Sequence, residues 1–154
     1  MPIVVSISMR SKPAWFYQQS GVIPYRMVDG NFEILLITSR RRGRWIIPKG
    51  IVEPGFTAAE SAQKEAAEEA GVVGSVSAAP VGEYRYQKWG GECTVQVFTL
   101  HVQTVLDTWP EAADRKRQWM ALHEAAHAVR EPELQQLIST LPESLKTSTT
   151  KGEL

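Results

Sequence analysis

The sequence contains a single cysteine, Cys93, among its 154 residues. One cysteine can form no intramolecular disulfide and no zinc site built from several cysteines, so a reducing compartment is the simplest location. No apolar run approaches the roughly 20 residues of a membrane-spanning helix. The apolar stretch at residues 3–9 is short, interrupted by serines and followed by Arg10 and Lys12. We therefore expect a cytoplasmic protein with no membrane partner.

The chain also lacks an excess of charge of either sign. Seventeen Lys and Arg residues balance seventeen Asp and Glu residues, and the isoelectric point is about 6.8. Such a protein has no overall field that would hold it on a nucleic acid, so we expect no nucleic-acid partner. The length corresponds to about one domain. With 43% hydrophobic residues, the chain is apolar enough to form a packed core.

Extended segments surround one strongly helical segment. Residues 20–28 and 32–38 are predicted to form a hairpin, because Asp29-Gly30-Asn31 between them tolerates positive φ. Further expected segments are strands at 45–48, 72–81, 84–87, 93–105 and 118–122, and helices at 123–130 and 132–141. Residues 1–19 are interpreted as a leader, 20–142 as the domain and 143–154 as a polar tail. This order predicts an α+β or α/β sandwich with helices covering a mixed sheet.

A helix is predicted to begin after Thr57. Thr57 and Glu60 form a capping-box pattern, and strong helix formers follow as far as Ala70. Gly71 suits the left-handed position that ends a helix. Four alanines share one face of this helix: Ala59, Ala62, Ala66 and Ala70. These small side chains would allow the helix to lie close to a sheet.

Three carboxylates share a neighbouring face of the same helix, at Glu65, Glu68 and Glu69. At spacings of three and four residues they repel one another by a few tenths of a kcal/mol per pair, and only Lys64 lies beside them. Hard carboxylate oxygens with no His or Cys nearby suit Mg²⁺, with Mn²⁺ as the alternative, and these ions commonly bind one or two carboxylates together with phosphates. The competing interpretation is a solvated acidic helix face.

The segment from residue 50 to residue 72 resembles the Nudix box, G-x5-E-x7-R-E-U-x-E-E-x-G-U, in which U is aliphatic. Seven positions are in register: Gly50, Glu65, Ala66, Glu68, Glu69, Gly71 and Val72. Two positions differ, since Phe56 stands where the box has Glu and Lys64 stands where it has Arg. Lys64 keeps the charge without the two-pronged guanidinium, which weakens its expected brace to a carboxylate. Phe56 removes an outer carboxylate and leaves the number of metal ions open.

The resemblance extends over roughly residues 19–140. Segments at 19–26, 34–40, 44–48 and 97–119 are similar to the branch of the Nudix family that is like diphosphoinositol polyphosphate phosphohydrolases. The resemblance implies an α/β/α sandwich and Mg²⁺-dependent hydrolysis of a diphosphate linked to another moiety. Diphosphoinositol polyphosphates and dinucleoside polyphosphates are the favoured small substrates, and smaller nucleotide diphosphates stay open, because recognition loops choose the substrate. The sequence leaves the oligomeric state open.

The resemblance also implies roles for the glutamates. Glu65 and Glu69 would be metal ligands, with a backbone carbonyl near Gly50 assisting, and Glu68 would orient or deprotonate the attacking water. Which glutamate is the general base stays open. Lys64 and Gly71 support the motif. Because Phe56 departs from the box, a Nudix-fold binding module without catalysis remains an alternative.

Five cations lie within ten residues: Arg40, Arg41, Arg42, Arg44 and Lys49. Guanidinium groups bind phosphate in two-pronged fashion, so this density suits a ligand with many phosphates. We expect substrate contacts from four of them, Arg40, Arg42, Arg44 and Lys49. By the same resemblance, Arg115 and Arg117 reach the phosphates. The alternative for both groups is a solvated basic loop.

His123 and His127 match the H-E-x-x-H pattern of zinc proteases. An apolar stripe already explains this helix as a packing element: Leu122, Ala125, Ala126 and Val129. His101, the one further histidine, falls on a predicted strand. A zinc hydrolase is therefore the less favoured alternative, and we expect no zinc at this helix.

Overall fold

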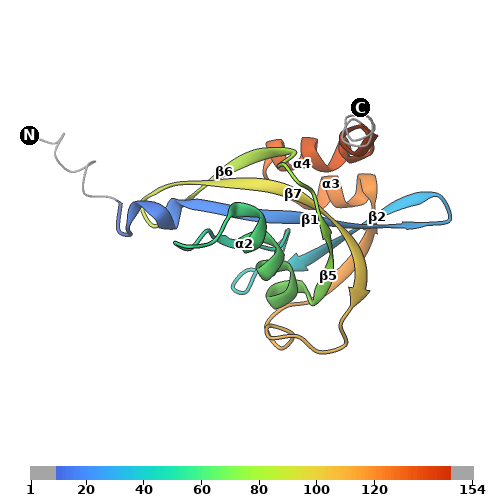
Figure 1. Ribbon diagram of the computed structural model, residues 1–154, viewed down its shortest axis with the longest axis horizontal. Helices are drawn as coiled ribbons and strands as arrows, with labels where there is room; N and C mark the ends of the chain where they lie inside the picture. Colours follow the sequence, from blue (N-terminus) through green and yellow to red (C-terminus); the bar gives the residue numbers. More distant parts are fainter. Residues whose placement is uncertain (1–9, 147–154) are drawn as a thin grey trace, which may run out of the picture.

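The computed structural model describes residues 10–146 (Figure 1). Eight strands form one sheet: β1 (Gln18–Val28), β2 (Asn31–Thr38), β3 (Trp45–Ile46), β4 (Lys49–Ile51), β5 (Val72–Val76), β6 (Gly82–Lys88), β7 (Gly91–Val105) and β8 (Arg117–Ala121). The helical elements are the 3₁₀-helix η1 (Ala14–Tyr17), α2 (Ala58–Glu65), the π-helical η2 (Ala66–Ala70), α3 (Leu122–Ala128) and α4 (Pro132–Ser139).

Strand β1 lies at the centre of a mixed sheet. It pairs in parallel with β7 and antiparallel with β2 and β4. The predicted hairpin of β1 and β2 is confirmed, with positive φ angles of 52° and 80° at Asp29 and Gly30. β7 also pairs with β5 and β6, and β2 pairs with β3 and β8. The β1–β7 pairing brings segments more than 70 residues apart side by side.

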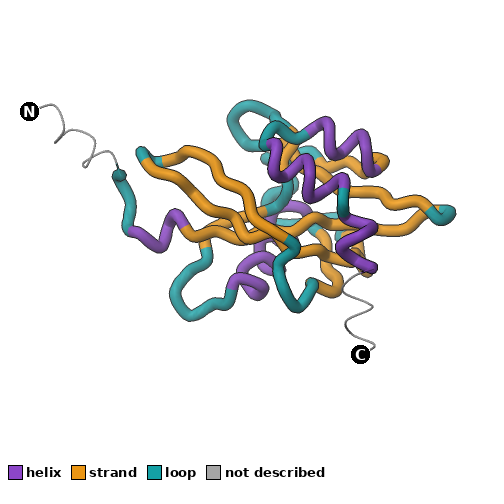
Figure 2. The backbone as a smooth tube through the Cα atoms, turned by 90° about the horizontal axis from the view of Figure 1, so that it is seen from above, coloured by secondary structure: helices purple, strands orange, loops and turns teal. Residues whose placement is uncertain are grey.

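Alternate side chains of the sheet enter two separate cores. Ile34 and Leu36 of β2 pack with α3 and α4, whereas Leu35 and Ile37 of the same strand pack with the alanines of α2 and η2. This alternation is the two-residue period of a strand that is covered on both faces. Helices therefore cover both faces of the sheet (Figure 2), and the predicted α/β sandwich is confirmed.

The predicted capping box starts α2. Thr57 Oγ1 accepts a hydrogen bond from Glu60 N at 3.1 Å, and Glu60 Oε1 accepts one from Thr57 N at 2.8 Å. The last five residues before Gly71 differ from the predicted α-helix, because they form the wider π-helical turn η2. Gly71 then ends the helix with φ of 65°. Within this π-helical turn, Glu69 is buried whereas Glu68 is only partly buried.

Ordered structure begins before the expected domain boundary at residue 20. η1 and the first residues of β1 lie in the segment interpreted as a leader, and Tyr17 is completely buried. Its hydroxyl donates a hydrogen bond to Trp89 O at 2.6 Å. The weakly alternating run before residue 10 lies outside the described residues.

Helical structure also extends beyond the expected end at residue 142. Residues 141–146 are helical, Leu141 is buried, and Leu145 packs against the core under α3 and α4. These apolar side chains explain why the first part of the expected tail is packed. The remainder of that tail, residues 147–154, lies outside the described residues. None of the helices within residues 10–146 has the length and hydrophobicity that crossing a bilayer requires.

Candidate active site

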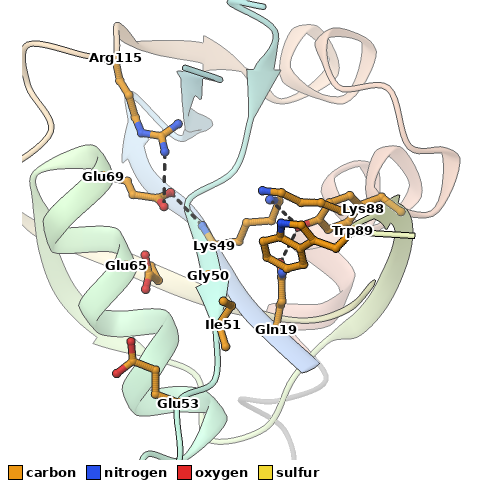
Figure 3. A pocket seen from close by; sticks show the side chains of 11 residues that line it. Gln19, Lys49, Gly50, Ile51, Glu53, Glu65, Glu69, Lys88, Trp89 and Arg115 are labelled. Carbon is orange, nitrogen blue, oxygen red and sulfur yellow. Dashed lines mark hydrogen bonds and ion pairs between the residues drawn. The ribbon is translucent and has the colours of Figure 1, made fainter. Parts of the chain in front are cut away.

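A hollow of about 320 Å³ opens at β4, between the helix α2–η2 and the hairpin of β6 and β7 (Figure 3). Three kinds of side chain line it: the carboxyls of Glu53, Glu65 and Glu69, the cations Lys49, Lys88 and Arg115, and the aromatic rings of Tyr86 and Trp89. Gln19, Gly50 and Ile51 complete the wall. Acidic and basic groups therefore meet in one place in a chain of zero net charge.

The acidic side of the hollow is formed by Glu65 and Glu69, one helical turn apart. Burial raises the pKa of Glu65 to about 8, and the charge of Glu69 and a hydrogen bond with it add to the rise. Burial also raises the pKa of Glu69, although Arg115 and the amide of Lys49 oppose the shift. Ionising both acids is therefore unfavourable, and a cation bound between them would offset that cost.

Several contacts fix the orientation of Glu69. Its Oε1 accepts a hydrogen bond from Lys49 N at 3.1 Å, and its Oε2 lies 3.5 Å from Arg115 Nη2. Arg115 also pairs with Glu111 at 2.8 Å and donates to Thr38 O at 3.0 Å. The Glu69 side chain, in a residue only 7% exposed, is thus held in place by β4 and by the loop before β8.

Gly50 belongs to the site because of what stands beside it. A Cβ at this position would collide with the Glu65 carboxyl group. The backbone of β4 therefore passes directly against that carboxyl, and any larger residue would push the carboxyl out of this position. This close approach explains the glycine that begins the box.

The donor set fits Mg²⁺ or Mn²⁺ better than zinc. Glu65 and Glu69 offer hard oxygens, and no histidine or cysteine lines the hollow. Across residues 10–146, no group of three or more His, Cys, Asp or Glu side chains is arranged to hold a metal ion. Mg²⁺ does not require such a cage, because it usually takes one or two carboxylates and completes its shell with water and substrate phosphates.

Glu68 is not brought into the hollow. Its side chain is 39% exposed and lies 3.9 Å from Lys64 Nζ, one turn earlier on the helix. The same ammonium lies 5.5 Å from the ring of Phe56, which is itself exposed. The two positions that depart from the box, Phe56 and Lys64, therefore lie together with Glu68 outside the wall of the hollow.

Lys49 is the member of the predicted basic group that enters the hollow. Its ammonium donates a hydrogen bond to the Tyr86 hydroxyl at 3.1 Å, and that hydroxyl donates to Gln19 Oε1 at 2.7 Å. Burial lowers the pKa of Lys49, and the charge of Glu69 counteracts the shift. The arrangement places a partly desolvated cation beside the acidic pair.

The predicted arginines are distributed over three places. Arg40 pairs with Glu111 at 3.1 Å and with Asp114 at 3.5 Å, so it reaches the site only through the Glu111 that also holds Arg115. Arg42 is exposed and forms no ion pair within the described part of the chain. Arg44 lines a second hollow of about 380 Å³, which shares the Tyr86 wall with the first.

Arg117 lies away from the hollow. Its guanidinium donates hydrogen bonds to Ala70 O at 2.9 Å and to Leu106 O at 2.7 Å. The same group lies over the Trp109 ring, with Cζ 3.8 Å from the ring centroid. These contacts clamp the end of η2 at Gly71. The structure thus gives Arg117 a packing role, whereas Arg115 lines the hollow.

His123 and His127 of α3 both remain exposed. The ring Nδ1 of His127 lies 2.8 Å from His123 O in the preceding turn. The stripe between them packs into the core as predicted, with Ala125, Ala126 and Val129 buried. No further ligand side chain joins the two histidines among residues 10–146.

Five lining residues were not predicted as site residues: Gln19, Glu53, Tyr86, Lys88 and Trp89. Glu53 lies just after β4, whereas the other four come together through the parallel pairing of β1 with β7 and the pairing of β6 with β7. The Gly90-Gly91 pair directly after Trp89, between the predicted strands at 84–87 and 93–105, was the available signal for a turn at this position.

Comparison with known proteins gives a consistent result. Residues 18–141 match the family model described as NUDIX domain. Nudix hydrolase 13, mitochondrial, of Arabidopsis thaliana is 33% identical over 155 residues, which cover 86% of this chain and 75% of that protein. Diphosphoinositol polyphosphate phosphohydrolase 3-beta of Bos taurus is 29% identical over 115 residues, covering 73% of this chain and 69% of that one. Among solved structures, a binary complex of the C. elegans Ap4A hydrolase has a TM-score of 0.71 at 23% identity, covering 84% of this chain and 98% of the other, which shows a common fold.

Proposed function

This chain belongs to the Nudix hydrolase family, and we propose that it hydrolyses the phosphoanhydride of a small polyphosphorylated molecule with the help of Mg²⁺. Phosphoanhydride hydrolysis follows from the family. The dependence on Mg²⁺ and the identity of the substrate are what we propose beyond the family. The observation that carries them is the pair of the half-buried Glu65 and the buried Glu69 against Gly50, which shares one hollow with several cations.

Glu65 and Glu69 would hold the ion, assisted by the backbone carbonyl of Gly50. When bound, Mg²⁺ neutralises phosphate charge and lowers the pKa of a coordinated water. Arg115 and the Lys49 amide keep Glu69 oriented for this role. Glu68, at the exposed side of the helix, would orient or deprotonate the attacking water, as the resemblance implies.

The phosphates would be bound by the cations of the hollow. Lys49 and Lys88 line it directly, and Arg115 stands behind the acidic pair. Arg44 borders the adjoining hollow, and Arg40 and Arg42 on the same loop would contact only a long substrate. The names of the relatives, a diphosphoinositol polyphosphate phosphohydrolase and an Ap4A hydrolase, support diphosphoinositol polyphosphates and dinucleoside polyphosphates as the candidate classes.

A binding module without catalysis is the second candidate. Phe56 in place of a box carboxylate and the outward position of Glu68 favour it. The two candidates differ in turnover, because a binding module would retain the ligand without hydrolysing it.

The test is a screen for hydrolysis products by anion-exchange chromatography with three substrate classes: a diphosphoinositol polyphosphate, diadenosine tetraphosphate and ADP-ribose. Of these, only the first releases inorganic phosphate directly, whereas the other two are split into nucleotides or into a nucleotide and ribose phosphate. Each reaction is run with Mg²⁺, with Mn²⁺ and with excess EDTA. We expect hydrolysis of at least one polyphosphorylated substrate with either ion and none with EDTA. Binding without hydrolysis under all conditions would support the second candidate.

A further inference from the structure

Trp89 occupies a backbone conformation that a tryptophan rarely adopts. With Gly90 it forms the two-residue turn between β6 and β7, where Lys88 pairs with Gly91. The φ angles are 53° at Trp89 and 68° at Gly90, both in the left-handed region. Such hairpin turns favour Asn, Asp or Gly at the first position.

The other tight hairpin of the molecule follows that preference. Asp29 and Gly30 between β1 and β2 have φ of 52° and 80°, the same pattern of signs. Asp29 is exposed, and Asp is one of the residue types that adopt this left-handed conformation readily. The hairpin geometry alone therefore does not explain a tryptophan at position 89.

The surroundings hold Trp89 firmly in that conformation. Its backbone carbonyl accepts hydrogen bonds from Tyr17 Oη at 2.6 Å and from Ser11 N at 3.0 Å. Its ring meets the rings of Phe16 and Tyr17 edge-on, with centroids 5.6 and 6.1 Å away. The segment before β1 thus fixes both the backbone and the indole plane.

The indole is nevertheless only partly buried, and it lines the hollow across β4 from Glu65 (Figure 3). Lys88 Nζ lies over the ring, 4.6 Å from its centroid, and Lys88 lines the same hollow. A rigid indole is suited to a nucleobase with phosphates attached, because a base would stack on the ring face that Lys88 does not cover while the ammonium remains close enough to pair with a phosphate. An inositol ring that carries phosphates has no flat π-face to offer and would call for further cations.

Resting on the proposed function, we infer that Trp89 is a specificity-determining residue that stacks on a nucleobase of the substrate. The inference assigns the active site to dinucleoside polyphosphates in preference to diphosphoinositol polyphosphates. Trp89 would act on substrate binding, at a distance from the acidic pair that carries the chemistry.

The test compares Trp89→Leu, Trp89→Phe and the control Trp15→Leu on diadenosine tetraphosphate and on a diphosphoinositol polyphosphate. Trp15 is an exposed tryptophan that does not line the hollow. Its ring centroid lies 4.5 Å from that of Phe16. Wild type should have the higher kcat/KM on diadenosine tetraphosphate. Trp89→Leu should raise its KM by about 5- to 150-fold, the range that corresponds to one stacked base. Its kcat should change little, and Trp89→Phe and Trp15→Leu should stay within a few-fold of wild type.

Melting temperatures establish that each variant is folded. If Trp89→Leu does not fold, Trp89→Asn replaces it, because Asn suits the left-handed turn. Equal losses on both substrates, no loss on either, or a wild-type preference for the inositol substrate would overturn the inference and leave the hydrolase assignment intact. Failure of wild type to hydrolyse any phosphoanhydride would instead overturn the proposed function.

Discussion

The helices on the two faces of the sheet differ in where they direct their polar side chains. On α2–η2, Glu65 and Glu69 face β4 and are largely removed from water. On α3, His123 and His127 point to solvent, while the residues between them enter the core. Both helices carry a spacing typical of metal enzymes, so spacing is not what separates them.

The two helices differ in the free energy that it costs to hold their ionisable side chains in place. Burial raises the pKa of Glu65 to about 8, which means that keeping it ionised at neutral pH costs free energy in the folded chain. An exposed histidine carries no comparable cost. Several contacts hold the acidic pair in place despite the free energy that its ionisation costs, which indicates a ligand that offsets this cost. The exposed histidines of α3 give no such indication.

The largest effect is expected for Glu69→Gln and Glu65→Gln. Either change keeps the size of the side chain and removes a negative charge that would bind the metal. We expect kcat/KM to fall at least about 100-fold, because a metal supplies several kcal/mol of transition-state stabilisation. Thermal unfolding should show unchanged or slightly raised stability, since repulsion between buried acids is removed.

Glu68→Gln is the matched comparison for these two variants. Its side chain, which lies beside Lys64, would act on the attacking water but would not hold the metal, so Glu68→Gln should lower activity less than Glu69→Gln does. Wild-type turnover by Glu69→Gln at saturating Mg²⁺ would refute the assignment of the site.

Gly50→Ala is expected to have the next largest effect. The added methyl group would press against the Glu65 carboxyl, which is the end of a flexible side chain and can move aside at little cost in stability. We expect little change in melting temperature but at least about a tenfold loss of activity, because the displaced carboxyl would no longer stand where it holds the metal. Gly55→Ala is not a suitable control, because φ is 94° at Gly55 and alanine would be strained there. The control is Ala59→Gly at the start of α2. Full activity of Gly50→Ala would show that close contact between β4 and Glu65 is unnecessary.

Much of the acidic site could be predicted from the sequence because its elements are local. The capping box, the alanine face and Gly71 fix α2–η2 within 15 residues, and Gly50 follows from the motif. The π-helical turn and the different burial of Glu69 and Glu68 could not be predicted, since helical periodicity places all three carboxylates on one face. Roles for the individual glutamates stay predictions.

The basic half of the site depends on long-range pairing and was less predictable. A run of five cations in ten residues indicated one phosphate site, but the residues separate where the chain changes direction after β2. Lys49 enters the hollow on β4, whereas Arg42 stays in the solvent-exposed loop. Charge density along a sequence therefore located the region without identifying the side chain that lines it.

Lys49→Gln should have an intermediate effect on KM, and comparing it with Arg42→Gln distinguishes the contribution of Lys49 from that of Arg42. Loss of a partly desolvated charged hydrogen bond to phosphate corresponds to about 1.5–3 kcal/mol, so we expect KM to rise about 10- to 150-fold. Arg42→Gln, at an exposed position, should raise KM by no more than about fivefold. Substrate titrations at low and high salt measure both variants. A larger effect at Arg42 than at Lys49 would mean that the exposed loop closes over the substrate.

The smallest effect is expected from the double variant His123→Ala, His127→Ala. Neither imidazole contributes to the apolar stripe that packs α3, and alanine favours a helix at both positions. Melting temperature and kcat/KM should therefore match those of wild type. Metal analysis of the purified wild type should find no zinc that the double variant lacks. Stoichiometric zinc that disappears with the histidines, together with loss of activity, would show that α3 holds a metal centre and that the contrast between the two helical layers is mistaken.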